Sequence, residues 1–525
     1  MRNKIIITAL LASTLLSGPH SGRAQQAPGA RPAGAIANPV LPGDFPDPSV
    51  VKIGDTYWAS ATTSDWGPVF PLLKSKNLQD WTLAGHVFPQ GHPAWADHYF
   101  WAPEISQDGR KTYIFYAAHQ KGGNLAVGVA SADRPEGPYT DNGPLVGQPD
   151  GSIDAFPVRD EKGKLYLVWK EDGNSIGQPT PIWAQPLNEA RTALTGEKKE
   201  LFRNDPKSWE AGLVEGVSMV RHGGYFYAFY AGNGCCGSGC TYATGVARAK
   251  NLLGPWEKDA KNPVLASNDA WKCPGHGTAV ERNGHWYLLH HAYAAQGFQN
   301  VGRQGVLSEF TWSAQGWPEF RGGVPAAPAP ALALRKEDVR DGFDGPALAP
   351  GWQWPINAEP AFALKNGRLE LTAQPAGNGA VLGHGIYTTG YTALATLLAP
   401  RAVPAGTAAG LVVVGSPDNA LALTVGGGNI QLWQREKGQP KILAETPLPA
   451  AAEALTLRLR VAATRYRFDY SADGGRTWQA LPGADAAVNG AFLPPWDLGV
   501  RVGVLAQGPA TSTVAFDKFS LTNQP

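Results

Sequence analysis

Five segments of the chain begin with an acidic residue or a histidine and then repeat one local pattern. In each, a short strand pattern follows the ionisable residue, then a glycine-containing turn, then an apolar strand pattern with a tyrosine. The ionisable residues are Asp47, Glu104, Asp154, Glu215 and His276. Two carboxylic acids held in one site can protonate a leaving oxygen and activate a water, the steps that cleave a glycosidic bond. The pattern therefore indicates acid–base hydrolysis.

The period of the repeat predicts the elements that position these residues. The tyrosines are Tyr57, Tyr113, Tyr166, Tyr227 and Tyr287, a spacing of 53 to 61 residues. A repeat of this length filled with short strands is typical of a β-propeller, with room for one four-stranded blade per unit. We predict an all-β chain in which residues 36–322 form a five-bladed β-propeller catalytic domain. Equivalent positions in the blades share one height on the central axis, so the five side chains should converge.

An acidic residue at the start of a strand usually caps a turn or lies there because its side chain is solvated. Any one of the five ionisable residues, taken alone, could therefore be structural. Carboxylates that share one cavity raise one another's pKa and cost stability, which is expected where function requires it. We therefore interpret the shared register as the mark of a site.

A second domain is expected after the repeats, because 525 residues exceed what one core usually holds. The Pro- and Ala-rich stretch 323–338 has the composition of a linker. In residues 339–525 the five-fold period is lost, and alternating segments such as 455–460 predict half-buried antiparallel strands. We expect a β-sandwich of the jelly-roll type.

The N-terminus has a cationic start, an apolar run from Ile5 to Leu16 too short to cross a bilayer, and small residues around Ala24. We predict a signal peptide over residues 1–24, cleaved after Ala24, and a linker over residues 25–35. The protein would be periplasmic or secreted, with no membrane attachment after cleavage. An uncleaved signal anchor is the alternative.

Composition narrows the class of partner. The formal net charge is +1 with no basic run, which argues against nucleic acid and favours a neutral substrate. The 63 glycines, 44 prolines and 18 tryptophans, with only 17% charged residues, fit an exported all-β protein. Nothing in the sequence indicates an oligomeric state.

The cysteines are Cys235, Cys236, Cys240 and Cys273. In an exported chain an even number favours disulfides, and their spacing fits no zinc pattern well. We predict two disulfides that tie the loop after the fourth tyrosine strand to the loop before His276, with a metal site as the alternative.

Five motifs cover essentially all of residues 38–320: Asn38-Pro-Val-Leu with Phe45-Pro-Asp-Pro-Ser49, Phe100-Trp-Ala-Pro-Glu104, Gly151-Ser-Ile-Asp154, Val214-Glu-Gly-Val-Ser218 and Pro274-Gly-His-Gly277. Together, and in this order, they resemble the five-bladed propeller hydrolases of glycoside hydrolase family 43. The C-terminal sandwich resembles the concanavalin-like jelly rolls appended to exo-acting members of that family.

The resemblance implies roles for the three central acids. Asp47 matches the general base that activates water, and Glu215 matches the general acid that protonates the leaving oxygen. Asp154 matches the residue that positions the acid and keeps its pKa raised. A single displacement of this kind inverts the anomeric configuration and needs a gap of roughly 6.5–9.5 Å between base and acid. Asp44 is an alternative base, but the Pro-Asp-Pro-Ser context favours Asp47.

Further residues are expected at the site. The resemblance places Glu104 beside the substrate as a supporting residue and lets Arg303 reach substrate hydroxyls near Asp154, with a structural salt bridge as the alternative. It also implies that His276 orients water around an axial calcium ion, against the alternative of a purely structural histidine. No cofactor is required for the chemistry itself.

Aromatic side chains near the motifs are candidates for stacking on a sugar. They are Trp66, Phe70, Trp95, Trp101 and Phe156. Strand alternation puts Phe156 on the same side as Asp154, two residues earlier, so it is the favoured substrate floor.

The leading hypothesis is an exported, inverting exo-glycosidase that removes terminal α-L-arabinofuranosyl or β-D-xylosyl residues from plant cell-wall polysaccharides. A β-D-galactofuranosidase or another specificity of the same family is the alternative. A retaining fructosidase would begin Asn-Asp-Pro-Asn-Gly, where this chain has Pro-Asp-Pro-Ser. A non-catalytic carbohydrate-binding propeller conflicts with the presence of all three acids.

Overall fold

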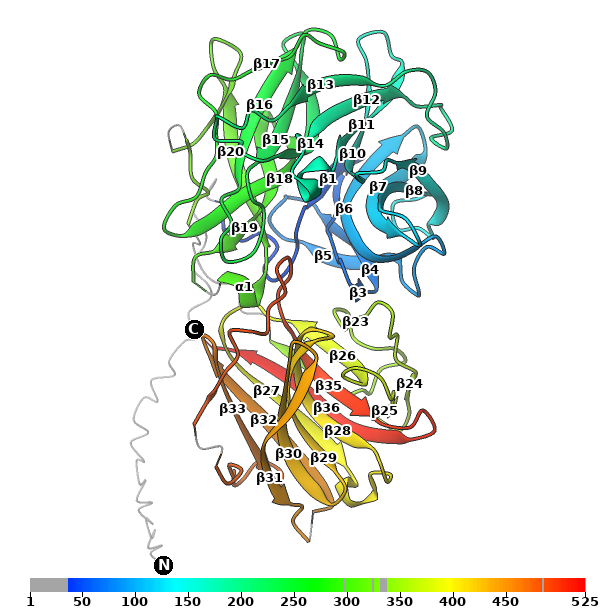
Figure 1. Cartoon of the computed structure of the whole chain (residues 1–525), viewed down its shortest axis with the longest axis vertical. Coiled ribbons are helices and arrows are strands. Elements are labelled where there is room, and N and C mark those ends of the chain that lie inside the picture. The colour runs from blue at the N-terminus through cyan, green and yellow to red at the C-terminus, as the bar shows by residue number, and fades with distance from the viewer. Residues whose placement is uncertain are drawn as a thin grey trace, which may run out of the picture. The chain divides into compact units, whose positions relative to one another are not determined.

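The computed structural model describes residues 36–296, 298–322, 325–330, 338–450, 452–483 and 486–524. The expected signal peptide, the linker 25–35 and residues 331–337 of the second linker lie outside the described residues. The described residues from Ile36 onward belong to one compact unit, whose regular secondary structure is almost entirely strand (Figure 1). Among the described residues no helix is long and apolar enough to span a membrane.

The first part of the described chain folds into five four-stranded antiparallel sheets. In blade order the strands are β1 (Ser49–Ile53), β2 (Thr56–Ser60), β4 (Val69–Ser75) and β5 (Thr82–Phe88); β6 (Ala96–Asp108), β7 (Lys111–Gln120), β8 (Leu125–Ala132) and β9 (Thr140–Gly147); β10 (Ser152–Arg159), β11 (Leu165–Glu171), β12 (Pro181–Pro186) and β13 (Lys199–Arg203); β14 (Val214–His222), β15 (Tyr225–Gly232), β16 (Ala243–Ala249) and β17 (Glu257–Lys258); β18 (Trp271–Arg282), β19 (His285–Ala294), β20 (Gln304–Trp312) and β21 (Pro318–Phe320). The first strands of the blades, β1, β6, β10, β14 and β18, contact one another in cyclic order. The predicted five-bladed propeller is confirmed.

The repeated tyrosines lie on the second strand of each blade. These strands are apolar and largely buried, as in β7, where residues 112–118 are all buried, because neighbouring blades cover both faces of the sheet. The period seen in the sequence is therefore the period of blade packing.

The ring closes where the start of the propeller meets its last blade. The backbone N–H groups of Val40 and Leu41 donate to the carbonyl of Gly305 at 2.9 and 3.1 Å. The buried Asn38 side chain donates to the Leu307 carbonyl (3.0 Å) and accepts from its N–H (2.9 Å). The loop that carries Asp47 is thereby anchored to β20.

The second part of the described chain is a sandwich of two antiparallel sheets, as predicted. One sheet orders its strands as β24 (Phe362–Leu364), β25 (Leu369–Thr372), β36 (Thr513–Asn523), β27 (Gly390–Leu398), β32 (Ala454–Ala462), β33 (Arg465–Ser471) and β34 (Val488–Asn489), with β22 (Val339–Asp341) also on β36. The other runs β26 (Ala380–Gly385), β35 (Arg501–Gln507), β28 (Ala408–Ser416), β29 (Asn419–Gly426), β30 (Asn429–Glu436) and β31 (Gln439–Pro447). Their facing apolar side chains form one core. The helical turns are α1 (Phe298–Val301), η1 (Gly173–Ile176) and η2 (Pro400–Ala402).

The sandwich packs against the first blade. Strand β23 (Trp354–Pro355) pairs with β3 (Trp66–Gly67). Trp66 is 3% exposed, packs with apolar side chains of the sandwich, and lies 5.3 Å from the Arg501 guanidinium. The prediction that Trp66 contacts substrate is therefore wrong, because docking of the second domain buries it.

The four cysteines form two disulfides, as predicted. Cys240–Cys273 joins the loop after β15 to β18, but Cys235–Cys236 links adjacent residues and bridges no loops. The expectation that both bonds tie the loops together is wrong for the second.

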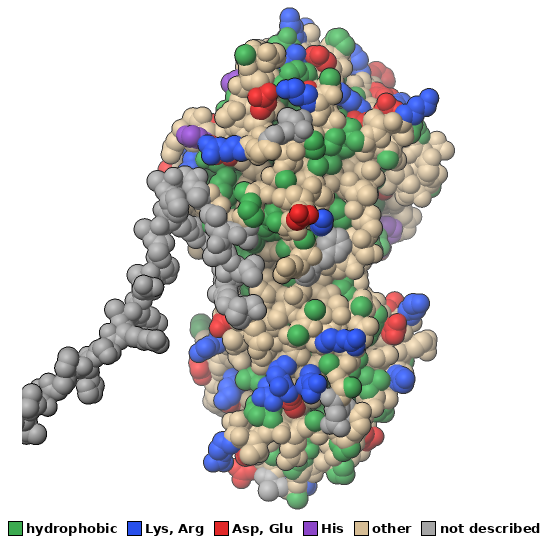
Figure 2. Space-filling view, turned by 90° about the vertical axis from the view of Figure 1, so that its left-hand side faces the viewer, with side chains coloured by type: hydrophobic (Ala, Val, Ile, Leu, Met, Phe, Trp, Pro, Cys, Tyr) green, Lys and Arg blue, Asp and Glu red, His purple; other side chains and the backbone are tan. Residues whose placement is uncertain are grey.

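On the face shown in Figure 2, acidic and basic side chains lie interspersed among hydrophobic and uncharged ones, in keeping with a net charge near zero.

Candidate active site

A cavity of about 350 Å³ lies where the inner strands of the propeller begin. Its wall contains Asp47, Asp154, Glu215, His276 and Arg303, which the sequence had singled out. It also contains Lys170 and Asp172 from the third blade, the Cys235–Cys236 pair, and Trp496 and Asp497 from the sandwich. Four of the five repeated ionisable residues thus converge as expected, all but Glu104, in a wall that the second domain completes.

A β-bulge interrupts four of the inner strands at the height of this cavity, where the pairing with the second strand shifts register. One residue of each bulge has a left-handed backbone: Ala102 (φ 46°), Asp154 (φ 57°), Gly216 (φ 62°) and His276 (φ 41°). Asp47 (φ 50°) has the same conformation just before β1. A non-glycine residue in this conformation costs on the order of 1–3 kcal/mol and is typical of functional sites.

The bulges correct the predicted register. Glu215 precedes its left-handed residue by one position, as Trp101 and Ile153 do, and all three line the cavity. Glu104 follows its left-handed residue by two positions, as Phe156 does, and neither lines the cavity. The five ionisable residues therefore occupy three different positions of the repeat.

Two predicted substrate contacts are wrong for this reason. Phe156 packs against the apolar cluster of the third and fourth blades, since the bulge breaks the two-residue alternation after Asp154. Glu104 instead accepts a hydrogen bond from Thr278 Oγ1 (3.3 Å), and desolvation raises its pKa to about 8. This hydrogen bond joins the second blade to the fifth, so Glu104 stabilises the packing of the propeller.

Among the other aromatic candidates, Phe70 and Trp95 belong to the core of the first two blades. Trp101 does line the cavity, and its Nε1 donates to Ser64 Oγ at 3.0 Å. Its ring stacks on Tyr99 (4.6 Å between centroids) and meets Trp496 edge-on (5.9 Å). Trp496 is 52% exposed, so an aromatic corner stands open to a ligand.

Asp47 is held as a carboxylate. Its Oδ1 accepts from Arg303 Nη1 (2.8 Å), its Oδ2 accepts from Thr62 Oγ1 (2.7 Å), and its backbone N–H donates to His291 Nδ1 (3.1 Å). Burial alone would raise the pKa of Asp47, but the Arg303 guanidinium and the nearby histidines hold it well below its usual range. Arg303 thus makes a salt bridge to Asp47 while it lines the cavity, rather than standing beside Asp154.

Glu215 lies against a buried cation. Lys170, 1% exposed, donates from Nζ to Glu215 Oε2 (2.6 Å) and to Asp172 Oδ1 (2.7 Å), and Tyr242 donates to Glu215 Oε1 (2.8 Å). Burial raises the pKa of Glu215, but the Lys170 charge and the two hydrogen bonds outweigh it, and the net shift is downward. The expectation of a raised pKa for Glu215 is therefore wrong for the free enzyme.

Asp154 carries the raised pKa instead. Burial is the main cause, Glu215 and Asp47 add to it, His276 and Lys170 oppose it, and the pKa is about 6. Its Oδ2 accepts from the backbone N–H of Gly216 (2.8 Å), so it fixes the backbone beside Glu215 rather than the carboxyl itself. A Cβ at position 216 would lie 2.8 Å from His276 Cγ, so this position requires glycine.

His276 lies between the acids, with Nδ1 at 3.5 Å from Asp47 Oδ1 and 3.8 Å from Asp154 Oδ2. Calcium takes six to eight oxygen ligands, whereas these two carboxylates already accept hydrogen bonds from Arg303 and Gly216. The described residues around His276 do not by themselves form a calcium cage. The calcium ion stays a prediction.

Sequence reasoning missed Lys170, Trp496 and Asp497. Lys170 had a signal, since a lysine ends the apolar run Leu165–Trp169 inside a strand, where a charge needs a partner. Asp497 accepts from Ser64 Oγ (2.9 Å), and its carbonyl accepts from Arg303 Nη2 (3.2 Å). No local pattern signals the two sandwich residues, because domain docking brings them to the cavity.

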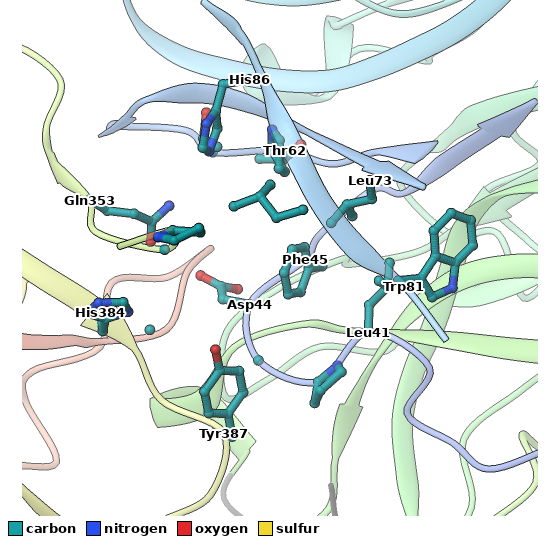
Figure 3. A pocket seen from close by; sticks show the side chains of 18 of the residues that line it. Leu41, Asp44, Phe45, Thr62, Leu73, Trp81, His86, Gln353, His384 and Tyr387 are labelled. Atoms are coloured by element: carbon teal, nitrogen blue, oxygen red, sulfur yellow. The ribbon is translucent and has the colours of Figure 1, made fainter. Parts of the chain in front are cut away.

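A second cavity, of about 250 Å³, lies between the first blade and the sandwich. Figure 3 shows His86, Leu73 and Trp81 of the blade facing Gln353, His384 and Tyr387 of the sandwich, with Asp44 between them. Thr62 lines this cavity and also donates to Asp47, which lines the first cavity, so this hydrogen bond links the two walls.

A model of the family described as glycosyl hydrolases family 43 matches residues 36–318. The chain belongs to this family. It is therefore a glycoside hydrolase, as predicted. A second model, described as the beta xylosidase C-terminal concanavalin A-like domain, matches residues 340–522 of this family 43 enzyme.

Two curated relatives illustrate the similarity to known proteins. A xylan 1,3-beta-xylosidase of Vibrio sp. is 29% identical over 60% of this chain and 64% of its own length. A non-reducing end alpha-L-arabinofuranosidase of Bacteroides ovatus is 26% identical over 64% of this chain and 63% of its own length. The chain thus spans just under two thirds of both.

The crystal structure of a xylan beta-1,4-xylosidase from Bacillus halodurans superposes with a TM-score of 0.79 at 23% identity. The match covers 93% of this chain and all of that one. At this identity the likeness bears on the fold, which includes both the propeller and the sandwich.

Proposed function

We propose that this family 43 enzyme is an inverting exo-glycosidase that releases terminal pentosyl residues, β-D-xylosyl or α-L-arabinofuranosyl, from plant cell-wall polysaccharides or their oligosaccharides. The observation that carries the proposal is one small cavity that holds Asp47, Asp154 and Glu215 in three different electrostatic environments. Acids tuned differently by their surroundings are what general acid–base chemistry needs.

Asp47 is the proposed general base. It is ionised at neutral pH because Arg303 holds its pKa down, so it can take a proton from a water that attacks the anomeric carbon. Thr62 fixes the second oxygen, so the lone pairs of the carboxylate have a defined direction. Direct attack by this water inverts the anomeric configuration.

Glu215 is the proposed general acid. Lys170 and Tyr242 hold one oxygen each and orient the carboxyl toward the cavity. In the free enzyme burial raises the pKa of Asp154, whereas Lys170 lowers the pKa of Glu215, and the two carboxyls titrate as a coupled pair. We assign Asp154 the positioning of Glu215, through the Gly216 N–H.

Exo action is supported by the sandwich, whose Trp496 and Asp497 close one side of the cavity. A pocket closed on one side favours the end of a chain over its middle. A xylosyl terminus is supported by the family description of the C-terminal domain, and an arabinofuranosyl terminus by the Bacteroides relative.

Hydrolysis of p-nitrophenyl β-D-xyloside, α-L-arabinofuranoside and β-D-galactofuranoside, followed by oligosaccharides, tests the substrate. Inertness of the wild type on all of these substrates would remove the proposal. Proton NMR of the first-formed anomer tests inversion, and a retained product would rule out Asp47 as base.

Comparison of Glu215→Gln with Asp154→Asn tests the assignment of the acid. p-Nitrophenolate departs without a proton, so loss of the acid should harm xylobiose hydrolysis more than p-nitrophenyl xyloside hydrolysis. We expect this pattern in full for Glu215→Gln and a weaker form of it for Asp154→Asn, because Asp154 acts only by positioning Glu215. The reverse result would exchange the two roles.

Export of the enzyme is also proposed. Its two disulfides are supporting observations, since such bonds persist in oxidising compartments. N-terminal sequencing of protein from the periplasm and the medium should give a chain that starts at Gln25. Calcium dependence is tested by dialysis against a chelator, and unchanged activity would remove the ion from the account.

A further inference from the structure

Two histidines and an aspartate converge on the second blade, outside the group of catalytic acids. Asp97 Oδ1 lies 2.5 Å from His98 Nδ1 and 2.8 Å from His119 Nδ1. One potential ligand atom from each side chain lies within 4.8 Å of the other two. Among the described residues, this is the cluster of three such side chains close enough to share a metal ion. The side chains are 27–34% exposed, so solvent can reach the cluster.

The backbone is shaped to bring these side chains together. Adjacent strand residues normally point to opposite faces, but register shifts flank His98 on both sides, and Tyr99 has a left-handed φ of 55°. His98 is the cross-strand partner of His119, and their rings stack at 4.1 Å. The irregular backbone therefore adds Asp97 to a face that already carries a histidine pair.

Contacts from outside the blade hold this irregular segment. Asn357 of the sandwich donates from Nδ2 to the Asp97 carbonyl (2.8 Å), and the Tyr99 N–H donates to Asp65 Oδ1 (3.1 Å). Hydrogen bonds thus hold the backbone on either side of His98. This lowers the entropic cost of ordering the cluster around a ligand.

We propose that Asp97, His98 and His119 bind a divalent transition-metal ion. Two imidazoles and one carboxylate suit zinc, cobalt or nickel, whereas calcium and magnesium prefer oxygen ligands alone. In the metal-free protein each Nδ1–H can donate to Asp97. On binding, each ring carries its proton on Nε2 and turns its Nδ1 lone pair to the metal. Water completes the coordination on the open side.

The rest of the described chain offers little competition for such an ion. All four cysteines are in disulfides, so no thiolate is available. His285 pairs with Glu309 (3.0 Å), but this pair has no third ligand within reach in the described residues. Tyr99 connects the Asp97–His98–His119 site to the catalytic cavity. Its ring contacts His98 (4.3 Å between centroids) and also Trp101, which lines that cavity.

Isothermal titration of the untagged, full-length protein with Zn²⁺ alone tests the site. We expect one ion per chain, with affinity reduced about tenfold or more in His119→Ala and unchanged in His285→Ala, the matched control. Titration with Co²⁺ should give a visible d–d spectrum that the same variant loses.

The proposal is overturned if no 1:1 binding occurs, or if His119→Ala and His285→Ala bind alike. Asp97→Asn serves as a second variant that keeps the size of the side chain. Thermal melting of each variant shows that it is folded, and equal Zn²⁺ affinity of folded Asp97→Asn and wild type would also contradict the site. Hydrolysis by the folded variants is followed separately, so this result does not depend on the proposed function.

Discussion

Asp44 and Asp47 lie three residues apart on one loop, and each is paired with an arginine, yet they serve the two different cavities of this enzyme. Asp44 accepts from Arg501 Nη1 (3.0 Å), from the Gly499 N–H (2.9 Å) and from the Arg303 N–H (3.2 Å). Its side chain and that of Arg501 are both 2% exposed, between blade and sandwich (Figure 3). Asp47 stands in the wall of the other cavity, among groups that titrate.

The difference between the two aspartates is in what surrounds the ion pair. Around Asp44 the lining is mostly apolar, and its carboxylate receives backbone and arginine donors that hold the sandwich in place. Asp47 lies 3.5 Å from His276, and its charge raises the pKa of Asp154 in the same cavity wall. A buried Asp–Arg pair therefore does not by itself identify a catalytic residue, but a cavity wall of several ionisable groups does.

Asp47→Asn should break the catalytic side of this comparison. The amide cannot take a proton from water, so we expect kcat to fall by about 10²–10⁴-fold with little change in KM. Steady-state kinetics on the preferred aryl glycoside measures this. A kcat within a few-fold of wild type would assign the base to another residue.

Asp44→Asn should break the structural side. Removal of one partner of a buried ion pair costs about 3–5 kcal/mol, so the free energy of unfolding should fall by that amount. The kcat of the folded variant should remain close to that of wild type, because Asp44 does not line the catalytic cavity. Urea unfolding and kinetics on the same preparation give both values. A large loss of kcat without a loss of stability would mean that the two aspartates are not distinct in role.

The sequence predicted the architecture and the convergence of Asp47, Asp154, Glu215 and His276, because a period of blade packing is a long, regular signal. It misplaced Glu104 and Phe156 because the bulges shift side chains by one position. A bulge depends on pairing with the neighbouring strand, which a residue pattern does not contain.

The sequence also failed to predict contacts between distant parts of the chain. Trp66 had the right type and place for a sugar contact, but strand β23, almost 290 residues further on, covers it. Trp496 reaches the cavity for the same reason, through docking of the sandwich. Such residues follow from the fold of both domains together and not from local composition.

Lys170→Met sharpens the comparison from the side of the acid. Glu215 is faced by Lys170 on β11, Tyr242 before β16, Asp154 on β10 and His276 on β18. The Lys170 charge lowers the pKa of Glu215, so its removal should raise that pKa. Because the acid must be protonated to act, the alkaline limb of kcat/KM against pH should move to higher pH.

The acid limb of the same profile should stay in place, since it reports ionisation of Asp47, which Arg303 controls. Lys258→Met is the matched control, because Lys258 pairs with Glu210 (2.7 Å) away from the cavity. An alkaline limb that moves to lower pH, or that moves equally in both variants, would contradict the role given to Lys170.

Trp496→Ala tests whether the sandwich takes part in the catalytic cavity or only packs against the propeller through Asp44. The Trp101–Trp496 corner offers an aromatic face to a sugar, and such contacts are worth about 0.5–1.5 kcal/mol. KM should therefore rise about twofold to tenfold while kcat changes little, since Trp496 touches no proposed acid or base. Trp478→Ala is the control, because Trp478 contacts Arg458 on the sandwich. If kcat fell and KM did not change, Trp496 would be acting on the chemistry and not on substrate binding. The sandwich would then contribute to catalysis itself as well as to docking through Asp44.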